Sequence, residues 1–281
     1  MAVSEQLKAL VDQLPDPDGR GMYNTDIDKQ KIENIVAQIH QGGRDYVLGL
    51  IDMLGEPGSD EDVKPHYALH CLANHVLKIK DENARRQFCE TVASQLGGDR
   101  SKYVQAFLCQ ELQWAGHREA VAPLRKLLLD EELVEPATMA LVAIREGAAE
   151  PLRAALPNAQ GKCRLNVIQA LGAIGDTQSA DALRQALGDD DREVRLAAAW
   201  SLARMGDPRS VDGLLKAADC QPGWERIQAA KHCLVLAEKL AAAGRNDLAE
   251  KIYNHLRNTR TEATEHYLRN AAEQGLAATK Q

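Results

Sequence analysis

The stretch DTQSADALRQALGDDDREVRLAAAWSLARMG, residues 176–206, decides the fold. It begins with apolar residues at helical spacing, passes through an acidic run at 189–191, and returns to helical spacing before it closes on Gly206. Glycine often follows the last residue of an α-helix, because it adopts a positive φ without strain. The stretch therefore predicts two short helices joined by a tight acidic turn.

The same plan recurs on both sides of this stretch, over 117–145, 148–175 and from Asp207 onward. In the second helix of each unit a leucine returns at intervals of 29, 30 and 31 residues, at Leu112, Leu141, Leu171 and Leu202. In the first helix the intervals are 28, 31 and 31 residues, at Leu124, Leu152, Leu183 and Leu214. Self-similarity at a fixed period of this length is the signature of a repeat protein.

The composition agrees with an all-helical chain. The 281 residues include 42 Ala and 35 Leu, which lose little on entering a helix, and only 4% are aromatic. A β-sandwich is nearly excluded, because strands favour β-branched and aromatic residues. With 44% hydrophobic residues the chain can also build a core, which excludes wholesale disorder.

The net charge of −7 is distributed unevenly. Residues 1–98 hold 10 Lys and Arg against 16 Asp and Glu, whereas residues 99–281 hold 24 against 25. Proteins that bind nucleic acid present a basic stripe to the phosphates, and the linear sequence has none. Folding could still gather scattered arginines on one face, but we expect no nucleic-acid partner.

The cysteines and the apolar runs indicate the compartment. None of the six cysteines forms a C-x-x-C pair, so buried thiols in a reducing compartment are expected rather than a zinc ribbon or a redox motif. No apolar run approaches the length of a membrane span, and no basic-then-apolar leader opens the sequence. We expect no membrane partner and a cytoplasmic location, although a signal peptide that had been removed would leave the same sequence.

The motif DDDREVRLAAAWSLARMGDP, residues 189–208, resembles the short HEAT repeat of the phycobilisome-lyase type. In that family an Asp in the turn and an Arg six positions later form a ladder that orders neighbouring repeats. Asp189 and Arg195 have this spacing. One repeat earlier, Asn158 and Arg164 keep the interval without the acidic charge, so the resemblance implies an incomplete ladder.

The resemblance is strong over 116–220 and extends through degenerate repeats over 43–115. Residues 65–100 also resemble HEAT-repeat proteins common in planctomycete-type bacteria, whose roles are mostly unassigned. Together, the repeats and the resemblance predict an all-α fold, a right-handed α-solenoid (α-α superhelix) of HEAT-like helix pairs.

The ends of the chain depart from the repeat, which predicts three regions. Residues 1–42 form an N-terminal helical extension, residues 43–222 the HEAT-repeat solenoid, and residues 223–281 a tetratricopeptide-like hairpin with a C-terminal capping helix. In the hairpin, Gly244 falls at the turn, and Ala249 and Tyr253 follow at helical spacing. A terminal cap is needed because the last repeat would otherwise expose an apolar face.

The densest group of chemistry-bearing residues is PHYALHCLANHVL, residues 65–77. His66 and His70 lie one helical turn apart, a spacing that can hold a transition metal when a third ligand joins. His75 lies off their face, and two exposed polar side chains are the simpler interpretation. Because the sequence also lacks a G-x-S-x-G elbow, a P-loop and a G-x-G-x-x-G motif, we predict no catalytic site, no bound metal and no cofactor.

The tryptophans offer the best candidate for a binding surface. Trp200 lies off the packed stripe of its helix, at the position that Gln110, Met139 and Gln169 hold in earlier repeats. In HEAT solenoids this side is the concave surface, and Trp beside Arg and Gln is typical of a binding hot spot. The predicted partner-binding residues are Gln110, Trp114, Arg164, Gln169, Arg195, Trp200 and Arg204.

Two further expectations follow from the same register. Leu196 and Ala199 are expected on the open side of the helix, whereas Trp224 is expected to pack at the start of its own helix. An alternative for Trp200 is that it wedges between adjacent repeats.

The sequence therefore predicts a non-catalytic scaffold or adaptor that presents a concave surface to another protein. Two alternatives stay open: a metal-binding or lyase-like protein with a site near His66 and His70, and a structural subunit of a larger assembly. The identity of the partner and the oligomeric state are not encoded in any motif.

Overall fold

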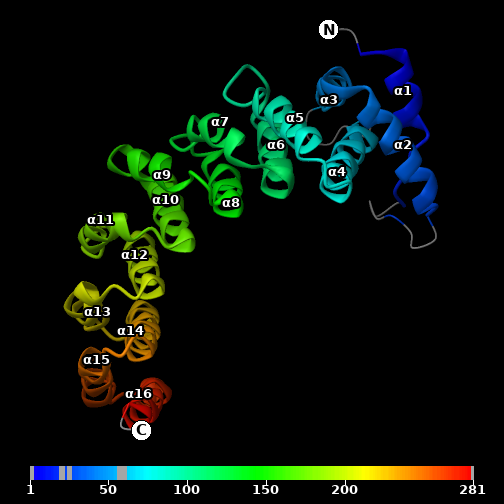
Figure 1. Ribbon diagram of the computed structural model, residues 1–281. Helices are drawn as coiled ribbons and strands as arrows, with labels where there is room; N and C mark the ends of the chain where they lie inside the picture. The colour runs from blue at the N-terminus through cyan, green and yellow to red at the C-terminus, as the bar shows by residue number, and fades with distance from the viewer. Residues whose placement is uncertain (1–2, 19–22, 24–26, 56–61, 280–281) are drawn as a thin grey trace. The chain divides into compact units, whose positions relative to one another are not determined.

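The computed structural model describes residues 3–18, 23, 27–55 and 62–279 (Figure 1). In this part of the chain the regular structure is helical, and no strand occurs. The all-α solenoid of helix pairs is thereby confirmed. The chain divides into two compact units, Met1–Pro151 and Leu152–Gln281, which are described separately below.

The first unit stacks helix pairs in two rows. Its helices are α1 (Glu5–Asp12), α2 (Lys29–Gln41), α3 (Gly43–Asp52), α4 (Val63–Lys78), α5 (Glu82–Ala93), α6 (Lys102–Ala115), the 3-10 turn η2 (Arg118–Ala120), α7 (Val121–Arg125) and α8 (Val134–Ile144). The second helices α4, α6 and α8 pack on one another in succession, and α3 packs on α5 in the row of first helices. Helix α2 packs on α4, so the N-terminal segment continues the stack.

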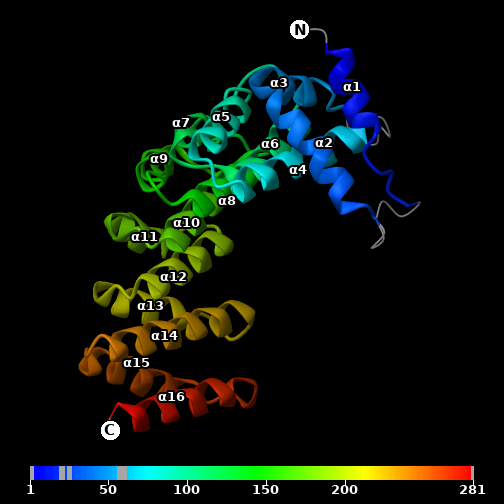
Figure 2. The same cartoon turned by 45° about the vertical axis from the view of Figure 1, so that its right-hand side comes forward.

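The second unit has the same two-row plan. It contains α9 (Ala149–Ala155), in which the boundary falls, η3 (Leu156–Asn158), α10 (Gly161–Ile174), η4 (Thr177–Ser179), α11 (Ala180–Ala186), α12 (Arg192–Met205), η5 (Pro208–Ser210), α13 (Val211–Ala218), α14 (Trp224–Ala242), α15 (Asn246–Thr259), η6 (Ala263–Glu265) and α16 (His266–Ala278). Figure 1 shows α11, α13 and α15 in one row and α12, α14 and α16 in the other. In Figure 2 these second helices lie stacked one above another.

The two leucine series form the core of the stack, as predicted. Each of their side chains is at most 1% exposed, which holds for Leu112, Leu124, Leu141, Leu152, Leu171, Leu183, Leu202 and Leu214. Small residues let neighbouring second helices approach closely. A Cβ atom added to Gly172 of α10 would lie 2.8 Å from the Cα of Ser201 in α12, so only glycine fits there.

The ends of the helices follow local chemistry. Asp191 caps α12, because its side chain accepts a hydrogen bond from the amide of Glu193. The same helix ends at Gly206, which has a φ of 69°, and α10 ends at Gly175, which has a φ of 74°. The tight acidic turn and the closing glycine predicted from the sequence are both present.

The Asp–Arg ladder predicted from the resemblance is present and runs between repeats. Arg164 Nε donates to Asp189 Oδ2 at 2.8 Å. Arg195 Nη1 donates to the carbonyl oxygen of Asp189 at 2.8 Å, and its Nη2 lies 2.7 Å from Glu225 Oε1. Glu225 thus takes the acidic role in the next repeat, although it lies inside helix α14 rather than at the ladder position in the turn.

A second ladder was not predicted. Arg153 Nη1 lies 2.5 Å from Asp176 Oδ1, and Arg184 forms the equivalent ion pair with Asp207 one repeat later. Each pair joins a first helix to the turn before the next repeat, at an interval of 23 residues. Both carboxylates are nearly buried, so these pairs fix the orientation of neighbouring repeats more firmly than exposed pairs would.

The predicted C-terminal hairpin is formed by α14 and α15. Gly244 lies at its turn with a φ of 74°, and Ala249 and Tyr253 are buried. Helix α16 covers the hairpin, and its Gly275 lies directly against the ring of Tyr253. The proposed region boundaries at residues 42 and 222 stay predictions.

Candidate functional site

Four of the seven predicted binding residues are exposed on second helices. Gln110 and Trp114 are exposed on α6, and Gln169 is exposed on α10. On α12, Arg204 is exposed and Trp200 is half-buried.

Trp114 is the centre of the surface in the first unit. Its side chain is 55% exposed and stacks on His70 of α4, with ring centroids 5.9 Å apart and planes inclined by 19°. His70 Nδ1 lies 3.1 Å from Oε1 of Glu111, a carboxylate that is 2% exposed. The hydrogen bond to Glu111 raises the pKa of His70, although burial alone would lower it.

Aromatic side chains extend this surface along α6. The ring of Phe107 contacts His66 edge-on, with centroids 4.3 Å apart, and the ring of Tyr103 lies 5.7 Å from the same histidine. We call this surface the α4–α6 face. Its residues on α4 are His66 and His70, and its residues on α6 are Tyr103, Phe107, Gln110 and Trp114. Tyr103 and Phe107 are not among the predicted binding residues, although their intervals of 11 and 7 residues to Trp114 are helical.

The pair of His70 and Glu111 predicts a pH dependence at this face. Because the pKa of His70 is raised in the folded chain, the pair contributes its full stability below the unfolded value of about 6.5 and loses it as the pH rises through the folded value. An NMR titration of the His70 ring should give a midpoint above 6.5. In Glu111→Gln the midpoint should fall to about 6.5 or lower, because burial then dominates.

The exposed Glu90 of α5 provides the control, since Glu90→Gln should leave the titration of His70 unchanged. A titration midpoint of His70 at or below about 6.5 in the unmodified protein would show that Glu111 does not stabilise the protonated ring of His70.

The histidines of α4 are not arranged as a metal site. His66 Nδ1 lies 2.8 Å from the carbonyl oxygen of Asp62, whereas His70 turns to Glu111. Within the described residues, no group of three or more His, Cys, Asp and Glu side chains could hold a metal ion. His66 and His70 therefore have separate hydrogen-bond partners, Asp62 and Glu111, in the part of the chain that the structure describes.

The second unit presents a smaller surface. The guanidinium of Arg204 lies 4.9 Å from the ring centroid of Trp200, a cation–π contact on α12. We call Trp200 and Arg204 the α12 face. Arg164 and Arg195 are half-buried and take part in the ladder, so their guanidiniums join repeats.

Two expectations about orientation are wrong. Leu196 and Ala199 are 8% and 1% exposed. They line a pocket together with residues of α11 and α13 and do not lie on the open side of α12. Trp224 is 52% exposed, with the guanidinium of Arg192 lying 5.1 Å from its ring centroid. Trp224 is the first residue of α14 and precedes the buried residues of that helix, so about half of its side chain stays exposed.

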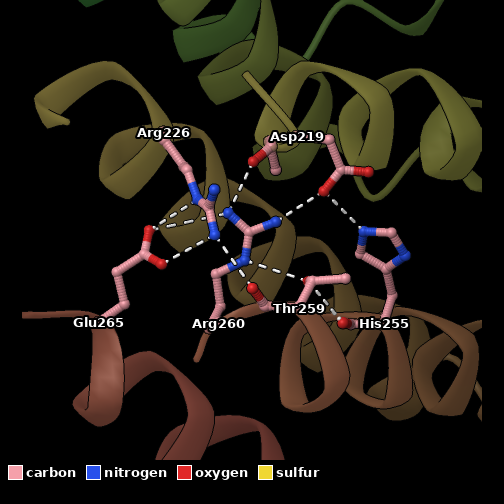
Figure 3. Close-up of polar contacts among 7 residues, drawn as sticks. Asp219, Arg226, His255, Thr259, Arg260 and Glu265 are labelled. Carbon is pink, nitrogen blue, oxygen red and sulfur yellow. Dashed lines mark hydrogen bonds and ion pairs between the residues drawn. The ribbon is translucent and has the colours of Figure 1, made fainter. Parts of the chain in front are cut away.

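A buried charged cluster joins the last helices of the second unit (Figure 3). Arg260, which is 1% exposed, donates to Asp219 Oδ1 and to the carbonyl oxygen of Ala218, both at 2.7 Å. Beside it, Arg226 Nη2 donates to Glu265 Oε2 at 2.9 Å. The charged groups satisfy one another, so this cluster holds α13, α14, α15 and η6 together rather than facing a ligand.

The six cysteines are buried or half-buried. Cys89, Cys109, Cys163 and Cys233 are buried, and Cys71 and Cys220 are half-buried. Burial raises the pKa of Cys109 and of Cys233 to about 12. A thiolate is the reactive form of cysteine, so these two side chains are unsuited to nucleophilic chemistry near neutral pH.

Comparison with known proteins identifies the repeats. Residues 149–235 match the family model for HEAT repeats. No curated protein matches the chain. No helix among the described residues is long and apolar enough to cross a membrane.

Solved structures share the fold at low identity. A chain in the structure of Kap95p with RanGDP has a TM-score of 0.53 and 12% identity, with 89% of this chain and 42% of that chain covered. An engineered protein has a TM-score of 0.50 and 18% identity, covering 98% and 78%. The CpcE and CpcF complex of phycocyanin lyase from a Nostoc species has a TM-score of 0.44 and 20% identity, covering 82% and 94%.

Proposed function

We propose that this HEAT-repeat protein is a non-catalytic scaffold or adaptor that binds another protein through the exposed side of its second helices, which we expect to form the concave face of the repeats. The observation that carries the proposal is the α4–α6 face, where an exposed tryptophan stacks on a histidine beside two further aromatic rings. On the α12 face, the guanidinium of Arg204 lies over the ring of Trp200, and we propose this pair as a second contact with the partner.

The composition of these faces supports binding to a protein. Trp, Tyr and Arg are the residues enriched at the energetic centres of protein interfaces. In this chain only 4% of residues are aromatic, yet Tyr103, Phe107 and Trp114 share one helix surface. Because helices hold them, little conformational entropy is lost when a partner docks.

The fold is compatible with this role. Kap95p, which shares the fold, binds RanGDP. Fold alone is a weak argument for function, so the weight rests on the exposed side chains. The net charge of −7 agrees with a partner other than nucleic acid, and the buried thiols support a reducing, cytoplasmic location.

Affinity capture of the tagged full chain, quantified by mass spectrometry, tests the proposal. We expect His70→Ala combined with Trp114→Ala, or Trp200→Ala combined with Arg204→Ala, to reduce recovery of a specific partner about tenfold or more, because truncated hot-spot residues cost about 2 kcal/mol or more each.

Exposed residues away from both faces provide matched controls. Leu129→Ala in the first unit and Arg209→Ala in the second should leave recovery unchanged, since both side chains are more than half exposed and belong to neither face. The proposal fails if the two double variants capture every partner as well as the unmodified chain does. A partner lost equally in the control variants would indicate a general loss of folding, which circular dichroism of each variant would reveal.

A further inference from the structure

A pocket of about 470 Å³ lies within the second unit, away from the α12 face. Helices α11 and α13 line it with Arg184, Gln185, Leu187, Gly213, Lys216 and Ala217. Its volume is within the range of about 300–1,000 Å³ that is usual for small-molecule sites. The proposed scaffold function makes no use of this pocket.

The deep part of the pocket is apolar. Leu196 and Ala199 of α12 and Ala229 of α14 line it and are 8%, 1% and 2% exposed. Small side chains leave the space open, and Gly213 lets Leu187 lie close to the backbone of α13, since a Cβ there would be 2.9 Å from Leu187 Cδ1. An aliphatic chain placed here would be removed from water, which is favourable.

Three cations, Arg184, Arg195 and Lys216, line the pocket together with one carboxylate, Glu225. Arg195 is paired with Glu225, and Arg184 is paired with Asp181 and Asp207, so the charges of both arginines are compensated. Lys216 is exposed at the rim, where its ammonium can reach a bound anion. The pocket therefore offers an apolar interior and a cation at its mouth, in a chain whose net charge is −7.

We propose that this pocket binds an amphiphilic monocarboxylate of the medium-chain fatty acid class. The aliphatic chain lies against Leu196, Ala199 and Ala229, and the carboxylate accepts hydrogen bonds from the ammonium of Lys216. A ligand with a positive head group would meet the ammonium of Lys216 unfavourably. The site therefore discriminates by head-group charge as well as by apolar length.

Protection of Cys220 from alkylation tests the proposal on the full chain. Cys220 lines the pocket and is half-buried, whereas Cys71 is half-buried in the first unit and lies outside it. Octanoate should slow alkylation of Cys220 by iodoacetamide in a saturable manner and leave Cys71 unchanged, with both thiols followed by peptide mass spectrometry. Octylamine, which has the same chain length and a positive head group, should protect neither thiol.

Substitutions at the rim and wall separate the two parts of the site. Lys216→Met keeps the apolar stem and should raise the octanoate concentration for half-protection about five- to tenfold, whereas Lys239→Met on a distant part of α14 should not. Ala217→Phe should abolish protection by filling the space.

Each outcome bears on the proposal. It is overturned if octanoate leaves Cys220 unprotected, if octylamine protects equally, or if Lys216→Met binds octanoate unchanged. Partner capture by the α4–α6 and α12 faces does not involve these residues, so the two tests fail or succeed separately.

Discussion

Replacing Arg260 by alanine is expected to lower the free energy of unfolding of the second unit by about 2–3 kcal/mol. The guanidinium is 1% exposed and lies between Asp219, with which it forms a hydrogen bond at 2.7 Å, and the buried Glu265. Its removal leaves the carbonyl oxygen of Ala218 without its donor (Figure 3). Glu265 keeps its ion pair with Arg226, and Asp219 is 44% exposed, so the cost is that of a buried acceptor without a donor and of lost charge-assisted hydrogen bonds.

Urea unfolding, with hydrogen exchange to locate the change, measures this effect. Protection should fall first in α14, α15 and η6, because the cluster joins these elements. The control is Arg269→Ala on α16, whose ion pair with Glu273 is about half exposed and should contribute at most about 1 kcal/mol. Equal losses in the two variants would mean that the buried cluster does not hold the C-terminal helices.

Gly172→Ala is expected to destabilise the contact between α10 and α12, although alanine is the better helix former. The added Cβ would lie 2.8 Å from the Cα and 2.5 Å from the Cβ of Ser201, so the two helices must separate. Overpacking of this kind costs about 1–3 kcal/mol, against a helix-propensity gain of about 1 kcal/mol. The separation also strains the buried hydrogen bond from Ser201 Oγ to the carbonyl oxygen of Ile168.

The measurement is again urea unfolding, with hydrogen exchange of α10 and α12 as the local readout. Gly98→Ala is the control, because a Cβ at Gly98 meets no heavy atom within 4 Å. Stabilisation by Gly172→Ala would show that the second helices have room to spare and that their close approach does not determine the stacking.

The periodic part of the fold could be predicted from the sequence because the core residues recur with it. Leu171 and Leu202 repeat at 31 residues and both are fully buried, and Gly206 ends its helix as expected. The ladder through Asp189 and Arg164 follows from the same register. The buried leucines and the ladder are contacts between adjacent repeats, and the sequence shows the spacing of these repeats.

Contacts outside the register could not be predicted in this way. Asp219, Arg226, Arg260 and Glu265 come from four segments with no common interval, so no pattern relates them. The expectation for Leu196 is wrong for a related reason. The leucine register predicts the position of a residue around α12, but it does not show which helices pack near that position.

The candidate binding surface was predicted in part. Trp114 was selected from its position off the packed stripe, and the structure places it in the open. Its partner His70 was known only as a possible metal ligand, because the contact joins two helices whose residues are 44 positions apart. The aromatic residues Tyr103 and Phe107 share the helical spacing of Trp114, which a search for exposed as well as buried stripes would have found.

Site-specific photo-crosslinking in cells tests the central proposal most directly. A photoreactive phenylalanine analogue is placed at Gln110 and Gln169, which are exposed on second helices, and at Leu129 and Arg209, which are exposed elsewhere. The scaffold proposal predicts that Gln110 and Gln169 form a crosslink to a defined protein and that Leu129 and Arg209 do not. Crosslinks formed equally at all four positions, or at Leu129 and Arg209 alone, would contradict it.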